Sequence, residues 1–170
     1  REQADTPRLD GVATNRIPTG EYLVMTGSGW GGAFGTGRDG SCVLTGHANI
    51  NTQSLVTGRS CPDAVQYPVV ALASNRAVLA ESPGTGCLAA GDEVLLINLQ
   101  GTAAAVTNVG NHEFLRVQSV AGSNVVFTEN LTRFYGNGAA DQTNIGTIST
   151  NQRVMLQRVP NYANLHSVFS

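Results

Sequence analysis

The chain has 170 residues, of which 41% are hydrophobic and only 13% are charged, and its formal net charge is −2. This balance suits one globular domain with a real core and excludes a disordered chain. All ten basic residues are arginines, scattered singly along the chain, so nucleic-acid binding has little support because no basic stripe could follow a phosphate backbone. The longest apolar run is far shorter than the roughly 20 residues of a membrane-spanning helix, so we expect no transmembrane segment.

The chain begins with a segment of low hydrophobicity, followed later by a glycine-rich one. Residues 1–20 are expected to form an N-terminal arm, and residues 21–170 a single β-rich domain. The first residue is Arg rather than Met, which fits a processed mature protein or an excised fragment. Residues 27–40 (GSGWGGAFGTGRDG) hold seven glycines and favour a loop. In that loop Trp30 could stack on a sugar ring or pack over the edge of the core.

The rest of the chain has almost no helical period. Short segments alternate or run apolar and are then cut by Gly, Pro, Asn, Asp or Ser, which is typical of a domain of short strands. A helix could enter only briefly, near residues 102–106. The expected strands are 21–26, 41–46, 54–58, 65–73, 76–81, 93–100, 112–120, 124–129, 152–159 and 164–169. We therefore predict an all-β fold, either a β-sandwich or a small β-barrel of short, mainly antiparallel strands.

The three cysteines suggest one disulfide. Cys61 and Cys87 bracket a 25-residue strand-like segment, and each lies beside turn residues. A bridge between them, with free thiols as the alternative, would stabilise the fold by about 3 kcal/mol through loop-closure entropy. It would imply an oxidising compartment. Cys42 is left as a small buried hydrophobe or an intermolecular partner. No C-x-x-C pair and no His at ligand spacing provides a zinc site, so no metal is expected.

Two stretches carry the clearest strand patterns. In GDEVLLINLQG (91–101) a Gly–Asp turn precedes the most hydrophobic run of the chain, and residues 94–97 are expected to be buried on both faces. In FLRVQSVAGSNVVFTE (114–129) apolar and polar residues alternate on either side of a short AGSN turn. That alternation predicts a hairpin with one solvated face.

Candidate catalytic groups are few. His47, His112 and His166 lie far apart in the sequence, and we expect them to be ordinary hydrogen-bonded histidines, although a triad assembled in space stays open. Asp92 and Glu93 are adjacent, but neighbours on a strand point to opposite faces and would not converge on one substrate. Without a G-x-S-x-G, H-E-x-x-H or P-loop motif, no catalytic residue is assigned and the chain is not expected to be an enzyme.

The loops that could bind an ion carry no clear binding motif. Residues 37–40 (GRDG) and 136–144 (GNGAADQTN) could hold a calcium ion, but neither alternates oxygen ligands regularly, so structural turns are favoured. Residues 130–132 (NLT) have the form of a glycosylation acceptor. No cofactor is expected.

Much of the chain resembles the N-terminal β-rich module of large secreted or surface proteins of myxobacteria and related bacteria. The resemblance runs from CLAAGDEVLLINLQGT through VGNHEFLRVQSVAGSNVVFTENLTRFYG to QRVMLQRVPNYANLHSV. The resemblance covers roughly residues 36–168 and implies an extracellular or cell-surface protein of a bacterium. It brings no catalytic residues. In those proteins the segment matching VPNYANLHSV leads into a repetitive β-helix, whereas this sequence stops after one strand. That departure favours another use of the terminal strand.

Residues 163–170 (ANLHSVFS) form the expected terminal strand, which could close its own sheet or pair with the exposed edge of a neighbouring molecule. The sequence has no Lys, the commonest residue that blunts an edge strand. We therefore expect a non-enzymatic secreted subunit that self-assembles with copies of itself into an extracellular filament or surface appendage by strand or arm exchange. Its contacts are expected at Ile17, Leu165, Val168 and Phe169.

The alternative is a carbohydrate-binding or adhesive module of a surface protein. Its partner would be a polysaccharide, and Trp30, Tyr67 and Tyr135 would provide stacking surfaces for sugar rings. A hydrolase on a β-scaffold has no motif in its favour. Fold class cannot decide among these functions, because function depends on sites that are grafted onto folds.

Overall fold

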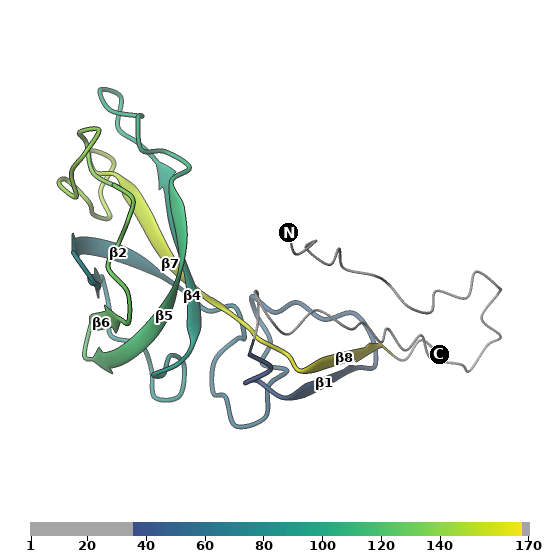
Figure 1. The fold of residues 1–170 in the computed structure, drawn as a ribbon. Helices are drawn as coiled ribbons and strands as arrows, with labels where there is room; N and C mark the ends of the chain where they lie inside the picture. Colours follow the sequence, from purple (N-terminus) through teal and green to yellow (C-terminus); the bar gives the residue numbers. More distant parts are fainter. Residues whose placement is uncertain (1–35, 168–170) are drawn as a thin grey trace, which may run out of the picture.

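The computed structural model describes residues 36–167, whose strands form a closed barrel and a separate two-stranded sheet (Figure 1). The barrel strands are β2 (Gln66–Ala73), β3 (Arg76–Leu79), β4 (Glu93–Gln100), β5 (His112–Ala121), β6 (Asn124–Phe127) and β7 (Arg153–Val159). They follow one another around the barrel in the order β2-β3-β6-β5-β4-β7. The pairs β2–β3, β3–β6, β6–β5, β5–β4, β4–β7 and β7–β2 are antiparallel. The all-β prediction is confirmed, and of its two forms the barrel is correct.

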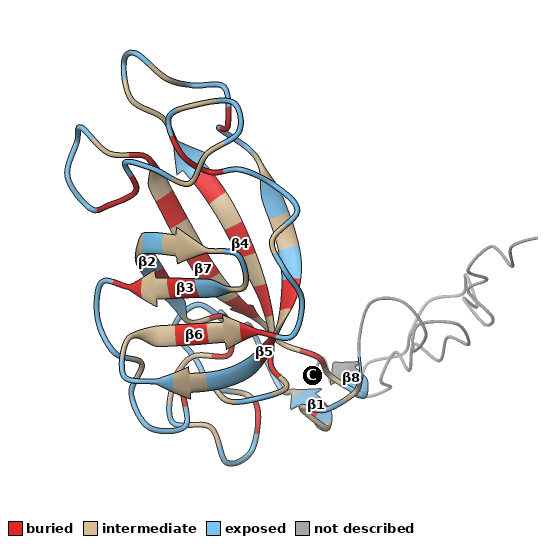
Figure 2. Cartoon of the chain, turned by 60° about the vertical axis from the view of Figure 1, so that its left-hand side comes forward, coloured by how far each residue is buried: buried red, intermediate tan, exposed pale blue. Residues whose placement is uncertain are grey.

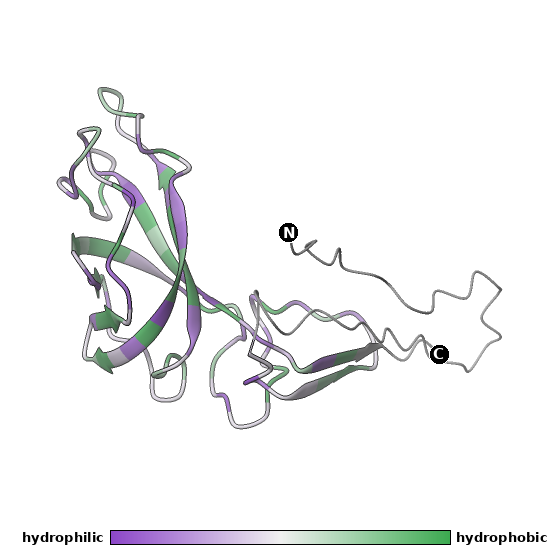
Figure 3. Ribbon diagram, in the orientation of Figure 1, coloured by the Kyte–Doolittle hydropathy of each residue, from purple (hydrophilic) through white to green (hydrophobic). Residues whose placement is uncertain are grey.

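The barrel strands alternate between an inward apolar face and an outward face. Hydrophobic and hydrophilic bands alternate along them in Figure 3, and buried and half-buried bands alternate along β4 in Figure 2. On β4, Val94 and Leu96 are fully buried, whereas Leu95 and Ile97 point outward and are half-buried. The expectation that residues 94–97 are buried on both faces is therefore wrong. Successive side chains of a strand point to opposite sides, and in a barrel only one side is the core.

The interior of the barrel is filled by side chains from all six of its strands. Each buried Val, Leu or Phe contributes about 1.5–3 kcal/mol relative to leaving it exposed. The contiguous hydrophobic cluster consists of Tyr67, Val69, Ala77, Leu79, Leu88, Val94, Leu96, Leu115, Val117, Val125, Phe127, Tyr135, Ile145, Val154 and Leu156. The barrel is thus a packed scaffold rather than a container, and its binding surfaces must lie on the outside or at the ends.

The hairpin predicted over residues 114–129 is confirmed. Strands β5 and β6 pair with Val117 opposite Phe127 and Ala121 opposite Asn124, which leaves a two-residue turn at Gly122 and Ser123. Gly122 adopts a φ of 57°, a left-handed conformation that suits glycine.

Two expected elements are absent from the structure. Residues 54–58 form no strand; the buried carboxylate of Asp63 instead accepts hydrogen bonds from the Leu55 and Val56 backbone N–H groups (2.9 and 3.4 Å) and holds the segment as a turn. Residues 102–106 form no helix, because Thr102 and Ala105 exchange two backbone hydrogen bonds of 3.0 and 3.1 Å in a tight turn. The described residues contain no helix that is long and apolar enough to cross a membrane.

Strands β1 (Ser41–Leu44) and β8 (Asn164–Ser167) form the second sheet, which we call the ribbon. They run parallel, with Ser41 beside Asn164 and Leu44 beside Ser167. The chain leaves β7, crosses residues 160–163 and enters β8, so the ribbon stands away from the barrel on one side of the molecule (Figure 1). The expected strand 21–26 and the expected arm 1–20 lie outside the described residues.

Candidate functional site

The ribbon exposes large apolar side chains on both of its strands. Val43 is 58% exposed and Leu165 is 42% exposed, although both lie on strands. Neither strand contains a charged residue, and within residues 36–167 neither outer edge of the ribbon has a partner strand. Isolated two-stranded sheets are marginally stable, and natural proteins usually protect such edges with charge, proline or a covering element. The ribbon therefore has the features of a surface that pairs with another strand.

The ribbon is mounted on the barrel through a buried set of charges, the junction cluster, made of Asp39, Arg59, Asp63, Asp92 and Arg158. Arg59 binds both carboxylate oxygens of Asp92, with Nη1–Oδ2 at 3.0 Å and Nη2–Oδ1 at 2.5 Å. Arg158, at the end of β7, donates to Asp39 Oδ1 and lies with its Nε 3.5 Å from Asp92 Oδ2. Since Asp39 precedes β1 and Asp92 precedes β4, these pairs tie the root of the ribbon to the end of the barrel.

The cluster constrains geometry more than it adds net stability. Its side chains are between 1% and 13% exposed where they form ion pairs. Burying charges costs desolvation that the pairing offsets only when every partner is present, so the loss of one partner is strongly destabilising. The hydrogen bond with Asp92 raises the pKa of Arg59 and outweighs the opposing effect of desolvation. The arrangement holds one orientation of the ribbon.

The connection between β7 and β8 is held by hydrogen bonds to two carboxylates of the junction cluster and to Glu93. The Asn161 backbone N–H donates to Asp39 Oδ2 (2.7 Å), and the Asn161 side-chain amide donates to Glu93 Oε2 (3.0 Å). The Tyr162 hydroxyl donates to Asp63 Oδ2 (2.6 Å), and burial together with this bond raises the pKa of Tyr162. The chain is thus fixed immediately before it enters β8.

The predicted disulfide between Cys61 and Cys87 is present. It joins the loop that carries Arg59 and Asp63 to the loop that leads to Asp92, so it also holds the junction cluster together. Cys42 on β1 is a free, buried thiol. Burial and the nearby Asp63 carboxylate raise the pKa of Cys42, which favours the uncharged thiol and the role of a small buried hydrophobe.

Sequence reasoning missed the junction cluster. The sequence placed Asp92 in a Gly–Asp turn and showed the arginines only as scattered single charges. The pairs are formed by residues far apart in the sequence: 33 residues separate Arg59 from Asp92, and 119 separate Asp39 from Arg158. No local spacing signals such contacts, because they exist only once the barrel closes.

Two of the three aromatic residues proposed as stacking surfaces are buried in the structure. Tyr67 is 5% exposed and Tyr135 is fully buried, so neither ring offers a face to a sugar. Both belong to the barrel core, and the Tyr135 hydroxyl donates to Glu113 Oε1 (3.0 Å). Trp30 lies outside the described residues.

Of the four proposed assembly contacts, Leu165 lies on the ribbon. Ile17, Val168 and Phe169 lie outside the described residues. Of the histidines, His47 is exposed in the loop after β1, and His112 begins β5 with its Nδ1 3.0 Å from the Gly110 carbonyl oxygen. His166 is on β8.

The loops at the other end of the barrel are held by carboxamide side chains. Asn98 donates from its amide to the Tyr135 carbonyl (3.0 Å) and to Gln152 Oε1 (2.9 Å), and Asn108 donates to the Gly136 carbonyl (2.8 Å). Asp141 accepts from the Gly138 backbone N–H (2.8 Å), which makes the 136–144 loop a structural turn. Among residues 36–167 no three His, Cys, Asp or Glu side chains are placed to hold a metal ion.

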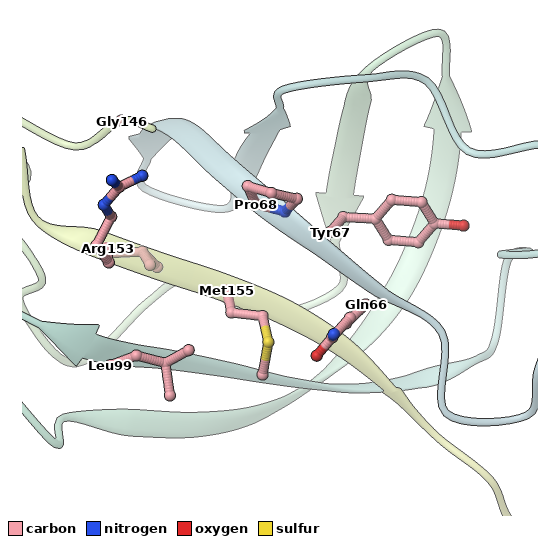
Figure 4. Close-up of a pocket in the computed structure, with 8 residues that line it drawn as sticks. Gln66, Tyr67, Pro68, Leu99, Gly146, Arg153 and Met155 are labelled. Atoms are coloured by element: carbon pink, nitrogen blue, oxygen red, sulfur yellow. The ribbon is translucent and has the colours of Figure 1, made fainter. Parts of the chain in front are cut away.

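The outer wall of the barrel carries a shallow pocket of about 310 Å³, which we call the wall pocket (Figure 4). It lies across β2, β7 and the end of β4. The residues that line it are Gln66, Tyr67, Pro68, Leu99, Gly146, Arg153, Val154 and Met155. Its lining is mostly apolar, with the half-buried guanidinium of Arg153 and the exposed carboxamide of Gln66 as its charged and amide groups.

No family model matches the chain, and no curated protein matches it. Three solved structures, all phage tailspikes, share distant similarity with it. The Gp54 tailspike of Acinetobacter baumannii bacteriophage AP22, in complex with A. baumannii capsular saccharide, has 17% identity and a TM-score of 0.36 over 60% of this chain and 15% of the tailspike. The Pseudomonas phage phi297 tailspike gp61 has 22% identity and a TM-score of 0.30 over 55% of this chain and 14% of the tailspike. The tailspike protein gp49 from Pseudomonas phage LKA1 has 18% identity and a TM-score of 0.34 over 72% of this chain and 20% of the tailspike. The chain thus spans a fifth or less of each tailspike, and no residue role is transferred from them.

Proposed function

We propose that the chain is a non-enzymatic extracellular assembly module whose ribbon pairs edge to edge with the ribbons of further copies. The observation that carries this proposal is the ribbon itself: two uncharged strands with exposed Val43 and Leu165, mounted rigidly on a packed barrel. The Cys61–Cys87 disulfide supports an oxidising, extracellular location. The resemblance to surface proteins of myxobacteria stays a prediction and agrees with that location.

A second copy is the partner that the ribbon geometry favours. The two outer edges of the ribbon differ, one belonging to β1 and the other to β8. If the β8 edge of one copy lies beside the β1 edge of the next, the contact repeats the parallel pairing that already joins residues 41–44 to residues 164–167. Such a head-to-tail contact closes into a ring or continues as a fibre.

The test is analytical ultracentrifugation over a range of protein concentrations. We expect the unmodified chain to sediment as an oligomer and Val43→Lys to sediment as a monomer at the same concentration, because a charged side chain on an edge strand opposes pairing. The matched control is Val106→Lys, which changes an even more exposed valine (67%) in the loop after β4 and should leave assembly intact.

Two results would contradict the proposal: a monomeric unmodified chain at the highest concentration, or assembly of Val43→Lys equal to that of the control. Thermal melting of both variants verifies that the barrel is folded. Electron microscopy of the oligomer then separates a closed ring from an open fibre.

A further inference from the structure

We propose that the barrel carries a second, independent binding site: the wall pocket binds an acidic sugar unit of a polysaccharide. The pocket faces solvent on the outer side of the barrel, whereas the ribbon projects from the end of the barrel where the junction cluster lies (Figures 1 and 4). Its volume of about 310 Å³ is at the low end of the roughly 300–1,000 Å³ range of small-molecule sites. It therefore suits one or a few sugar rings.

The apolar floor of the pocket results from strand register. Pro68 on β2 lies opposite Met155 on β7, and both side chains point away from the core. On β4 Leu99 continues the outward face of Leu95 and Ile97, and it is 54% exposed beside a register shift between Asn98 and Gln100. Pro68, Met155 and Leu99 together form a flat apolar surface that can pack against the C–H face of a pyranose ring.

One wall of the pocket is a preformed loop, residues 144–152. Gly146 donates its backbone N–H to the Gln152 carbonyl (3.2 Å), and the Asn144 side chain donates to the Thr150 carbonyl (2.8 Å). A Cβ atom at Gly146 would lie 2.4 Å from Asn151 Oδ1, so a larger residue here would displace the Asn151 side chain, whose amide donates to Asn144 Oδ1 (2.6 Å). The wall is thus in place before a ligand arrives, which lowers the entropic cost of binding.

Arg153 supplies the charge of the pocket. Its Nη1 donates to the Thr147 carbonyl, which orients the guanidinium along the loop. No carboxylate within residues 36–167 forms an ion pair with Arg153, so its other N–H groups are available to a ligand carboxylate, which a guanidinium can bind with two parallel hydrogen bonds. Gln66 lies on the other side of Met155 (Figure 4) and can donate to or accept from sugar hydroxyls.

These three features select the ligand class. A uronic acid has a C–H face for the apolar floor, hydroxyls for Gln66 and a carboxylate for Arg153. A fatty acid shares the carboxylate, but it offers no hydroxyls to the Gln66 carboxamide. A neutral sugar would leave Arg153 without a charged partner.

The test is an NMR titration of the full chain with galacturonic acid, galactose and decanoate. The methyl group of Met155 is a direct probe, because the sequence contains only two methionines. We expect galacturonic acid to shift the Met155 methyl and Gln66 amide signals with a dissociation constant in the millimolar range, and galactose to bind at least about tenfold more weakly. Arg153→Gln should abolish the preference for the acid, whereas Arg76→Gln, on an exposed arginine of β3, should not.

Binding of the acid by Arg153→Gln as tightly as by the unmodified chain would overturn the proposal. So would the absence of any shift with galacturonic acid, or shifts at these residues with decanoate alone. If Arg153→Gln fails to fold, Gln66→Ala at an exposed position replaces it and should weaken binding of both sugars. Val43→Lys should bind as the unmodified chain does, so failure of the assembly proposal and failure of this one are distinguishable.

Discussion

At the scale of the residue, Asp39 joins the root of the ribbon to the barrel through three partners. Its carboxylate accepts hydrogen bonds from Arg158, from Arg59 (3.4 Å) and from the Asn161 backbone (2.7 Å). All of these contacts form where the side chain is almost completely buried. Removing such a group leaves the positive charge of Arg158 in a low-dielectric site without its nearest counterion.

We therefore predict that Asp39→Ala lowers the free energy of unfolding by about 3–5 kcal/mol, as expected for a broken buried ion pair. Asp39→Asn should lower the free energy of unfolding by less, because its amide oxygen can still accept a hydrogen bond from the Asn161 backbone N–H. Urea denaturation measures both, with Asp141→Asn in the 136–144 loop as a control. A loss for Asp39→Ala no larger than that for the control would mean that the junction cluster does not hold the ribbon.

At the scale of the element, Glu113 on β5 fastens the segment that follows β6. Its carboxylate accepts hydrogen bonds from the Thr132 backbone (2.8 Å) and hydroxyl (2.7 Å), the Arg133 backbone (2.9 Å) and the Tyr135 hydroxyl (3.0 Å). Burial alone would raise the pKa of Glu113, but these hydrogen bonds together outweigh it and lower the pKa. The ionised form is therefore the one that holds the segment on the strand.

A pKa lowered by folding means that the unfolded chain binds this proton more readily than the folded chain does. The stabilisation by Glu113 is therefore complete above the unfolded-state pKa and is lost as the pH falls through the folded-state pKa. We predict that Glu113→Gln is less stable than the unmodified chain at about pH 7 and that this difference shrinks towards about pH 3. Urea denaturation at both pH values measures this difference in stability. A difference that does not depend on pH would contradict the conclusion that the ionised Glu113 carboxylate holds the segment on β5.

At the scale of the whole molecule, the disulfide connects the two loops that contribute to the junction cluster. Its sequence separation is 26 residues, and a loop of that order is worth roughly 3 kcal/mol of unfolding free energy. We predict that the double variant Cys61→Ser/Cys87→Ser loses about this amount and exchanges amide hydrogens faster at residues 39–44 and 161–165. Hydrogen–deuterium exchange measures the second effect. Cys42→Ser should retain the response of the unmodified chain to reductant, and uniform exchange across the barrel and ribbon would contradict the local role.

The sequence predicts those structural features that depend on residues close together in the chain, and it does not predict those that depend on residues far apart. The hairpin of β5 and β6 and the limits of β4 follow from alternation and turn residues, and cysteine spacing indicated the disulfide. The parallel pairing of Ser41 with Asn164 could not be foreseen, because alternation shows that a strand exists but not which strand lies beside it. For the same reason, the junction cluster and the wall pocket emerge only from barrel closure, which brings distant charges together and places β7 between β2 and β4.

The chain passes directly from β7 into β8, and this continuity has a mechanical consequence. A pull applied along β8 is transmitted by the covalent backbone of residues 160–163 to β7. That strand lies between β4 and β2, and it is hydrogen-bonded to both. Tension is therefore resisted in shear by two rows of hydrogen bonds acting together, rather than one bond at a time as when a strand is peeled from an edge.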